Sequence, residues 1–138
     1  MRMFCDASAL AKRYVEEAGS AELETLLGSA TTLGPSVIFV TEVVSALCRL
    51  LREGNVSEHQ YTQARTALLA DMADAEIVTL SEPLLVRAIG LLEAHSLRSA
   101  DALQVASAQE WGADLFVSAD RRQCAAAHSD GLPVRLLG

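Results

Sequence analysis

The chain is poor in the residues that mark several common classes of protein. It has three cysteines and 4% aromatic residues, and Lys12 is its only lysine. Cys5, Cys48 and Cys124 are odd in number and lack the paired spacing of a zinc site or a redox motif. The three histidines fall in segments typical of exposed helix ends, which disfavours a thiol–histidine pair. We therefore interpret the cysteines as small apolar residues in a reducing compartment.

Long apolar runs are also missing. The longest, such as residues 37–40, fall far short of the ~20 residues that span a bilayer. No charged segment followed by a long apolar stretch stands at the N-terminus, so neither a signal peptide nor an anchor is visible. We expect a cytoplasmic protein with no membrane partner.

Basic charge is scarce, and the formal net charge is −7. This balance argues against nucleic acid as a partner, because non-specific affinity for phosphate comes from lysine and arginine. Two features weaken the objection. Divalent cations would offset acids that form a metal site, and ten of the eleven basic residues are arginines, which bind phosphate bidentately.

Short apolar strands alternate with helical segments along the whole chain. The residues that predict strands are 3–5, 31–33, 76–80, 114–118 and 134–136, and the connections between them are too long for hairpins. Such alternation indicates a mostly parallel sheet covered by helices on both faces. With 138 residues, 51% of them hydrophobic, the chain predicts one domain over residues 1–138.

Helix boundaries can be placed from capping signals. Ser57 with Gln60 fits a capping box at the start of one helix. The helix that opens near Pro83 is expected to bury Leu85, Ile89 and Leu92, and Ser99 is expected to cap a helix over residues 100–111.

Asp6 follows the first strand directly and precedes a helical segment. In open α/β sheets, ligands bind at the carboxyl ends of the strands, where strand order reverses. Asp101 and Asp120 also begin helices, and each acid has an ordinary explanation. Asp6 can be an N-cap, Asp120 with Gln123 can form a capping box, and Asp101 is favoured by the helix dipole.

Glu42 is harder to explain, because it lies among Val37, Ile38, Val40, Val43 and Val44 on a helix with several apolar faces. Burying an unpaired carboxylate costs several kcal/mol or raises its pKa until it is neutral. Glu42 can instead occupy one solvated stripe with Ser45 and Arg49, so both interpretations stay open.

The four acids make a stronger case together. If Asp6 and Asp120 end neighbouring parallel strands, helices can bring Glu42 and Asp101 to the same crevice. Four carboxylates without lysine partners would repel one another unless hard cations neutralise them. Oxygen ligands with retained water suit Mg²⁺ or Mn²⁺. Since no histidine is at hand as a general base, the ion would generate the nucleophile from water.

At these residues the chain resembles a PIN domain, most closely the VapC-type toxins of bacterial toxin–antitoxin pairs. The resemblance rests on four motifs in the order of the family, which run from Asp6 to Arg13, from Glu42 to Leu47, from Ser99 to Leu103 and from Phe116 to Arg122. No single motif is specific, but the set spans the chain.

The resemblance implies a three-layer PIN-like fold with a mostly parallel five-stranded sheet. It also implies a Mg²⁺- or Mn²⁺-dependent endoribonuclease that forms a homodimer and is blocked by a cognate antitoxin. The family's acids map onto Asp6, Glu42, Asp101 and Asp120. Two hydroxyl residues that orient carboxylates or water map onto Ser8 and Ser118; many relatives have threonine where Ser118 stands.

Arg98, Arg121 and Arg122 are candidate contacts to the RNA backbone, although each can equally be a solvated surface charge. Two rival functions stay open. One is phosphoryl transfer through an aspartyl phosphate on Asp6, which is disfavoured because such enzymes commonly carry a second acid where Ser8 stands. The other is a catalytically silent PIN-like binding module, which has no reason to keep four mutually repelling acids.

Overall fold

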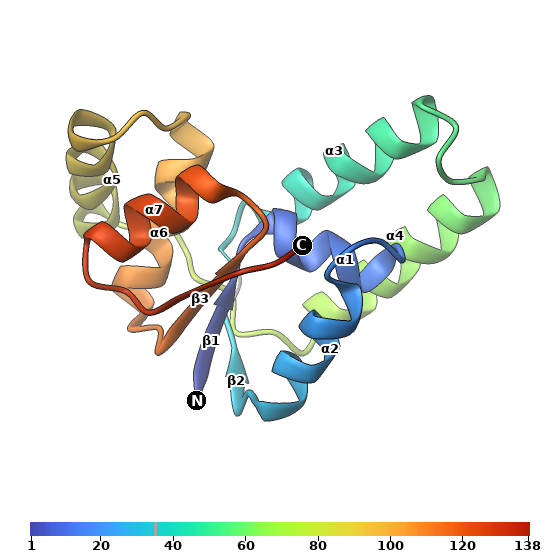
Figure 1. The fold of residues 1–138 in the computed structure, drawn as a ribbon, viewed down its shortest axis with the longest axis horizontal. Coiled ribbons are helices and arrows are strands. Elements are labelled where there is room, and N and C mark those ends of the chain that lie inside the picture. The colour runs from blue at the N-terminus through green and yellow to red at the C-terminus, as the bar shows by residue number, and fades with distance from the viewer. Residues whose placement is uncertain (35) are drawn as a thin grey trace.

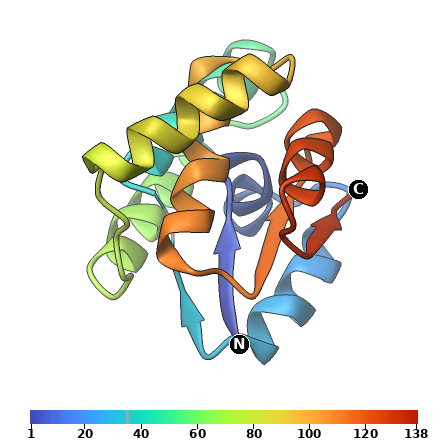
Figure 2. The ribbon, with the colours of Figure 1, turned by 90° about the vertical axis from the view of Figure 1, so that its left-hand side faces the viewer.

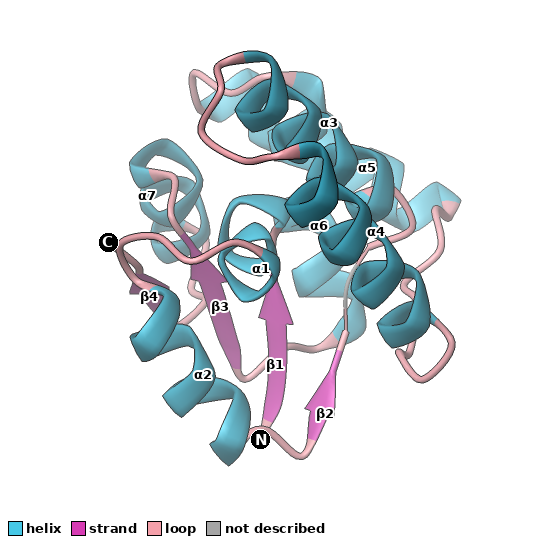
Figure 3. Cartoon of the chain, turned by 90° about the vertical axis from the view of Figure 1, so that its right-hand side faces the viewer, coloured by secondary structure: helices cyan, strands magenta, loops and turns pink. Residues whose placement is uncertain are grey.

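The computed structural model describes residues 1–34 and 36–138, and within them four strands form one parallel sheet. The strands are β1 (Arg2–Cys5), β2 (Thr32–Leu33), β3 (Leu115–Ser118) and β4 (Val134–Leu136), in the order β2-β1-β3-β4. β1 and β3 lie side by side in the middle of the sheet, with Cys5 opposite Val117 (Figure 3). Segments that follow these two strands therefore start from the same carboxyl edge.

The segment 76–80, which the sequence predicts as a fifth strand, is not a strand in the described residues. It makes one isolated parallel bridge, in which Ser36 pairs with Val78, and the Val37 N–H donates to the Val78 carbonyl at 2.8 Å. The pairing does not extend further along the chain after Ser36, because a helix begins at Phe39. The described residues thus form four strands, so the prediction of a fifth is not confirmed, while the parallel α/β arrangement is confirmed.

Helices make up the connections between the strands. They are α1 (Ala7–Tyr14), α2 (Ser20–Ser29), α3 (Phe39–Arg52), α4 (Glu58–Met72), α5 (Glu82–Ala94), α6 (Ser99–Trp111) and α7 (Arg121–Ser129). The capping box of Ser57 with Gln60 opens α4 as predicted. In the described part of the chain, no helix combines the length and the apolar character needed to cross a bilayer.

Alternate residues of β1 point into two different cores. Met3 and Cys5 pack in a cluster with residues of α1, α2, α3 and α4, whereas Phe4 packs with residues of α5, α6 and α7. On the second side, the ring of Phe4 stacks on that of Phe116 with centroids 5.9 Å apart. The sheet therefore lies between two groups of helices, which gives the three predicted layers (Figure 1). In Figure 2, the layer of α5, α6 and α7 faces the viewer.

The buried face of α5 differs from the predicted one. Leu84, Ala88 and Leu91 are buried, while Leu85 and Ile89 are 45% and 56% exposed. Leu92, also predicted to be buried, is 40% exposed. The reason is that α5 carries apolar residues on more than one side, so helical spacing fits two faces and only packing against α6 selects one.

All three cysteines are free thiols, and Cys5 and Cys124 are buried. Burial raises the pKa of the Cys5 thiol, which keeps it protonated and unreactive. The structure therefore agrees with their interpretation as apolar packing residues.

Gly34 lies directly against the ring of Trp111, and a Cβ at this position would be 2.5 Å from two of the ring carbons. The ring is held in place, because its Nε1 donates to Glu76 at 3.2 Å and the Arg2 guanidinium lies 4.1 Å from its centroid. We expect Gly34→Ala to lower the free energy of unfolding in urea by about 1–3 kcal/mol. Gly28→Ala is the control, because nothing lies within 4 Å of its added methyl group and alanine favours the helix. Equal urea midpoints for the two variants would contradict the prediction.

Candidate active site

Asp6 lies at the junction of β1 and α1 and is fully buried. Its Oδ1 accepts hydrogen bonds from the Ser8 hydroxyl at 2.7 Å and from the Ala9 N–H at 3.0 Å. Its Oδ2 accepts from the Ser118 hydroxyl at 2.6 Å. Asp6 is thus the N-cap of α1, and it also ties α1 to the end of β3.

The surroundings of Asp6 shift its proton affinity. Burial raises the pKa of Asp6 from 3.8 to about 6, and the negative charge of Asp120 adds to the increase. Hydrogen bonds from Ser118, Ser8 and Ala9 oppose the shift because they favour the ionised form. The carboxylate is therefore held in a place that disfavours its charge unless a cation approaches.

Ser8 and Ser118 join Asp6 to the chain that leads to the fourth acid. The Ser118 hydroxyl accepts from the Asp120 N–H at 2.9 Å, and the Ser8 hydroxyl accepts from the Ala119 N–H at 2.9 Å. The two hydroxyl oxygens are 3.3 Å apart. This small network fixes the position of residues 118–120 relative to the first strand.

Asp101 lies in the first turn of α6 and is 7% exposed. Its Oδ2 accepts from the backbone N–H of Arg98 at 3.3 Å and from the guanidinium Nε at 3.2 Å, and its Oδ1 accepts from Gln123 Nε2 at 3.0 Å. The prediction that Ser99 caps this helix is wrong. Arg98 is the N-cap residue, Ser99 is the first helical residue, and the Asp101 carboxylate reaches back to the cap.

Asp120 caps α7, with its Oδ1 accepting from the N–H groups of Arg122 at 2.8 Å and Gln123 at 3.2 Å. The predicted capping box is only half present. The Gln123 side chain does not reach back to the cap but crosses to Asp101, and it thereby links α7 to α6.

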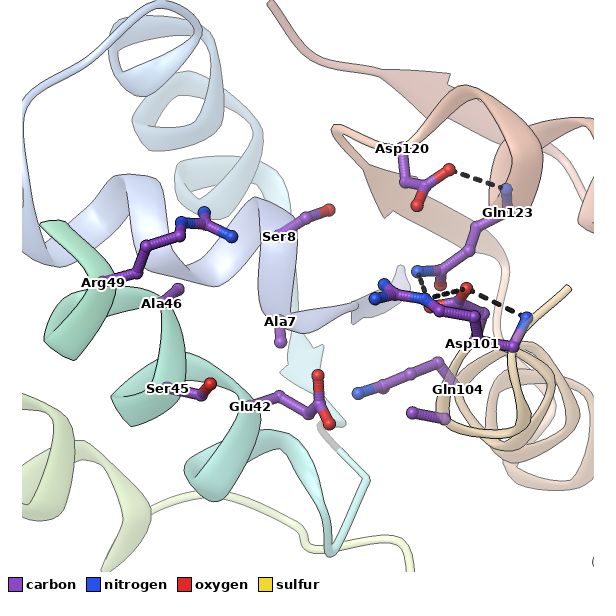
Figure 4. Close-up of a pocket in the computed structure, with 12 residues that line it drawn as sticks. Ala7, Ser8, Glu42, Ser45, Ala46, Arg49, Asp101, Gln104, Asp120 and Gln123 are labelled. Carbon is purple, nitrogen blue, oxygen red and sulfur yellow. Dashed lines mark hydrogen bonds and ion pairs between the residues drawn. The ribbon is translucent and has the colours of Figure 1, made fainter. Parts of the chain in front are cut away.

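A pocket of about 210 Å³ lies between α3, α6 and the start of α7. Glu42, Asp101 and Asp120 line it, together with Ser8, Arg49, Arg98, Gln104 and Gln123. Figure 4 shows the Glu42 carboxylate on α3 pointing across the pocket toward α6. Three of the four predicted acids thus share one pocket, whereas Asp6 lies buried behind its wall, joined to it through Ser8.

The carboxylates do not form a ready-made coordination sphere. Within residues 1–34 and 36–138, no three acids, histidines or cysteines lie close enough together to hold an ion as they stand. Asp6 is occupied by three donors, Asp101 by Arg98 and Gln123, and Asp120 by the first turn of α7. The hydrogen bond and the charge of Asp101, with the nearby charges of Asp120 and Glu42, raise the pKa of Arg98, whose guanidinium is the cation paired with Asp101 in this pocket.

The chemistry of the donor set nevertheless fits a hard divalent ion. The lining offers carboxylate oxygens, and it adds the Gln123 Oε1, a buried oxygen with no hydrogen-bond partner in the described structure. Hard cations such as Mg²⁺ prefer all-oxygen ligands and retain water. Coordination by Asp101 requires its bond with Arg98 to open, and Arg98, whose side chain is 80% exposed, is free to move into solvent.

Sequence reasoning missed Gln104 and the true contact of Gln123. Gln104 lies one helical turn after Asp101, so the spacing alone places it on the same face of α6. Arg121 and Arg122 are exposed and do not line the pocket, in contrast to Arg98.

Fold and pocket together define an α/β domain with an acidic site at the carboxyl edge of a parallel sheet. The chain belongs to the PIN-domain family, whose model matches residues 3–129. Ribonuclease VapC45 of Mycobacterium tuberculosis (strain CDC 1551 / Oshkosh) is 31% identical over 134 residues, covering 96% of this chain and 93% of the relative. The family resemblance predicted from the motifs is thereby confirmed.

Solved structures share the fold at lower identity. Mycobacterium tuberculosis VapC20, a Sarcin-Ricin loop cleaving toxin, matches with a TM-score of 0.68 and 19% identity over 90% of this chain and 94% of that chain. A toxin–antitoxin complex from Klebsiella pneumoniae matches with a TM-score of 0.67 and 20% identity over 96% and 95% of the two chains. These likenesses support the PIN-like α/β fold.

The raised pKa of Asp6 predicts a pH-dependent stability in the absence of metal. Because the folded state binds this proton more tightly than the unfolded state, the contribution of protonated Asp6 is full below about pH 3.8 and is lost as the pH rises through about 6. We expect the stability of wild type relative to Asp6→Asn to fall by about 2 kcal/mol between pH 4.5 and 7.5.

Urea unfolding of both proteins in chelator at the two pH values measures this difference. Asparagine keeps the shape of the side chain, and the Ser118 hydroxyl can turn to accept from its amide. A difference between the two proteins that does not change with pH would contradict the prediction.

Proposed function

We propose that this protein is a metal-dependent endoribonuclease that hydrolyses phosphodiester bonds of RNA. The observation that carries the proposal is the meeting of Glu42, Asp101 and Asp120 in one pocket, with Asp6 bound to its wall, in a chain that is 31% identical to a ribonuclease over 96% of its length. Distant acids have no other evident reason to meet on a face without lysine.

Asp6, Glu42, Asp101 and Asp120 are the residues that would hold Mg²⁺ or Mn²⁺, directly or through water. Such an ion supplies Lewis acidity, which lowers the pKa of water and stabilises charge on the phosphoryl group. The protein does the positioning. Ser8 and Ser118 fix the orientation of Asp6 through hydrogen bonds of 2.7 and 2.6 Å.

Arg98 has two roles in this proposal. It pairs with Asp101, and because its side chain is 80% exposed it would be able to turn toward the RNA backbone if Asp101 held a metal. Arginine binds phosphate oxygens bidentately, which suits it to the rim of an acidic site. Arg121 and Arg122 lie exposed at the start of α7 and are proposed as outer contacts to the same backbone.

We further propose that the protein is the cytoplasmic toxin of a toxin–antitoxin pair, inhibited by a cognate antitoxin protein. The support is the kinship with VapC ribonucleases, together with a fold shared with chains solved in toxin–antitoxin complexes. The free, mostly buried cysteines fit a reducing compartment.

The two rival functions gain no support from the geometry. An aspartyl phosphate on Asp6 is disfavoured because such enzymes commonly carry a second acid two residues on, where this chain has Ser8, whose hydroxyl donates to Asp6 at 2.7 Å. A silent binding module has no need for several acids around its pocket. Because neighbouring negative charges repel one another and lower stability, such a module would be expected to lose them.

RNA cleavage tests the function directly. We expect wild type with Mn²⁺ to cut total RNA at defined positions and Asp101→Ala to lower the rate by about 100-fold or more, since it removes an acid of the metal site. Asp74→Asn is the matched control, because Asp74 is exposed and lies outside the pocket. Sequencing of the RNA ends maps the cuts. Full activity of Asp101→Ala, or of wild type in excess chelator, would refute the proposal.

We propose a homodimer that uses the outer face of α5. Leu85, Val86, Ile89 and Leu92 expose apolar surface there, and Val86 is 63% exposed. Exposed apolar patches of this kind mark protein interfaces. We expect Ile89→Glu to convert the dimer to a monomer in size-exclusion chromatography with light scattering. Leu69→Glu, at a site on α4 that is 52% exposed, should leave the mass unchanged. A wild-type monomer, or a dimer that survives Ile89→Glu, would count against this surface.

A further inference from the structure

Gln104 is a buried amide in the wall of the acidic pocket and has no part in the proposed metal site. It lies on α6, one turn after Asp101, and is 3% exposed. Its Oε1 accepts a hydrogen bond from the hydroxyl of Ser36 at 3.1 Å. Its Nε2 has no hydrogen-bond partner among the described residues, although it is buried.

The direction of this amide follows from its two neighbours. Ser36 is fully buried, is not among the residues that line the pocket, and donates to the carbonyl oxygen of Gln104. On the other side, Gln104 points toward the carboxylate of Glu42 (Figure 4). The opposite orientation would turn the amide oxygen toward a negative charge, so the observed one, with Nε2 toward Glu42, is electrostatically favoured.

An unpaired buried donor is costly, so a pocket keeps one only where an acceptor arrives with a ligand. Glu42 faces the amide but makes no hydrogen bond with it in the described structure, and Arg98 is committed to Asp101. The missing partner therefore has to bring acceptor oxygens into the pocket. A phosphodiester carries such oxygens without a competing donor.

We propose that Gln104 is a substrate-binding residue whose Nε2 donates to a non-bridging oxygen of the RNA phosphate, with Ser36 as the residue that orients it. This inference rests on the proposed ribonuclease function and extends it to a named contact. A neutral amide suits the position, because it can bind phosphate without competing with a metal for the carboxylates. A second arginine here would compete for them.

Gln104→Met tests the contact, because methionine has nearly the same shape and no donor. With an RNA whose cut site has been mapped, we expect kcat/KM to fall about tenfold or more, mainly through KM. We expect the affinity for Mn²⁺ alone, measured by calorimetry, to stay within twofold. Because methionine also removes the acceptor of the buried Ser36 hydroxyl, kcat/KM is measured at a temperature at which both proteins are folded.

Two further variants and a modified RNA sharpen the test. Ser36→Ala should reduce kcat/KM less than Gln104→Met, because the donor stays but its orientation is freed. Gln109→Met is the matched control on the same helix, since Gln109 donates to Asp130 at 3.0 Å, away from the pocket. Sulfur in place of one non-bridging oxygen at the cut site should weaken binding to wild type but have little effect on Gln104→Met.

The outcomes separate this contact from the function on which it rests. If wild type cuts RNA and Gln104→Met does so with an unchanged KM, the proposed contact is overturned but the ribonuclease function is not. Weaker Mn²⁺ binding by Gln104→Met that disappears in a Glu42→Gln background also overturns it, because the amide would then serve Glu42. Wild type that cuts no RNA overturns the proposed function itself.

Discussion

The buried carboxylate of Asp6 is the point on which the structure depends. It connects the end of β1, the first turn of α1 and the end of β3 through three hydrogen bonds of 2.6–3.0 Å. Burial alone would disfavour its charge, and these donors supply part of the compensation. The two central strands are thereby held in register at the edge where the pocket opens.

Two of the three carboxylates that line the acidic pocket accept hydrogen bonds from residues around it. Arg98 and Gln123 bind Asp101, and the first turn of α7 binds Asp120. Each of these partners is replaceable: an exposed guanidinium can leave, and a carboxylate that caps a helix with one oxygen keeps the other for a ligand. The same contacts that stabilise the fold therefore leave carboxylate oxygens at the pocket for a ligand.

The two helical layers contribute unlike parts to this pocket. The layer of α1 to α4 contributes Ser8, Glu42 and Arg49. The layer of α5 to α7 contributes Arg98, Asp101, Gln104, Asp120 and Gln123. The pocket lies between the layers because β1 and β3 are followed by helices on different sides of the sheet. A switch point of this kind creates the crevice that binds ligands in α/β folds. This member of the PIN-domain family forms such a crevice in a chain of only 138 residues.

The sequence alone determined the parallel α/β class and the helix caps at Ser57, Asp6 and Asp120, because strand and helix periodicity and capping are local in sequence. Only the tertiary structure decided the rest. It limited the segment 76–80 to one bridge, and it turned Leu84 rather than Leu85 inward on α5. It also sent Gln123 to Asp101 instead of its own helix cap, and set the unpaired amide of Gln104 opposite Glu42. Each of these outcomes depends on which distant segment supplies a partner, and residue spacing along one chain carries no information about a partner that lies far away in sequence.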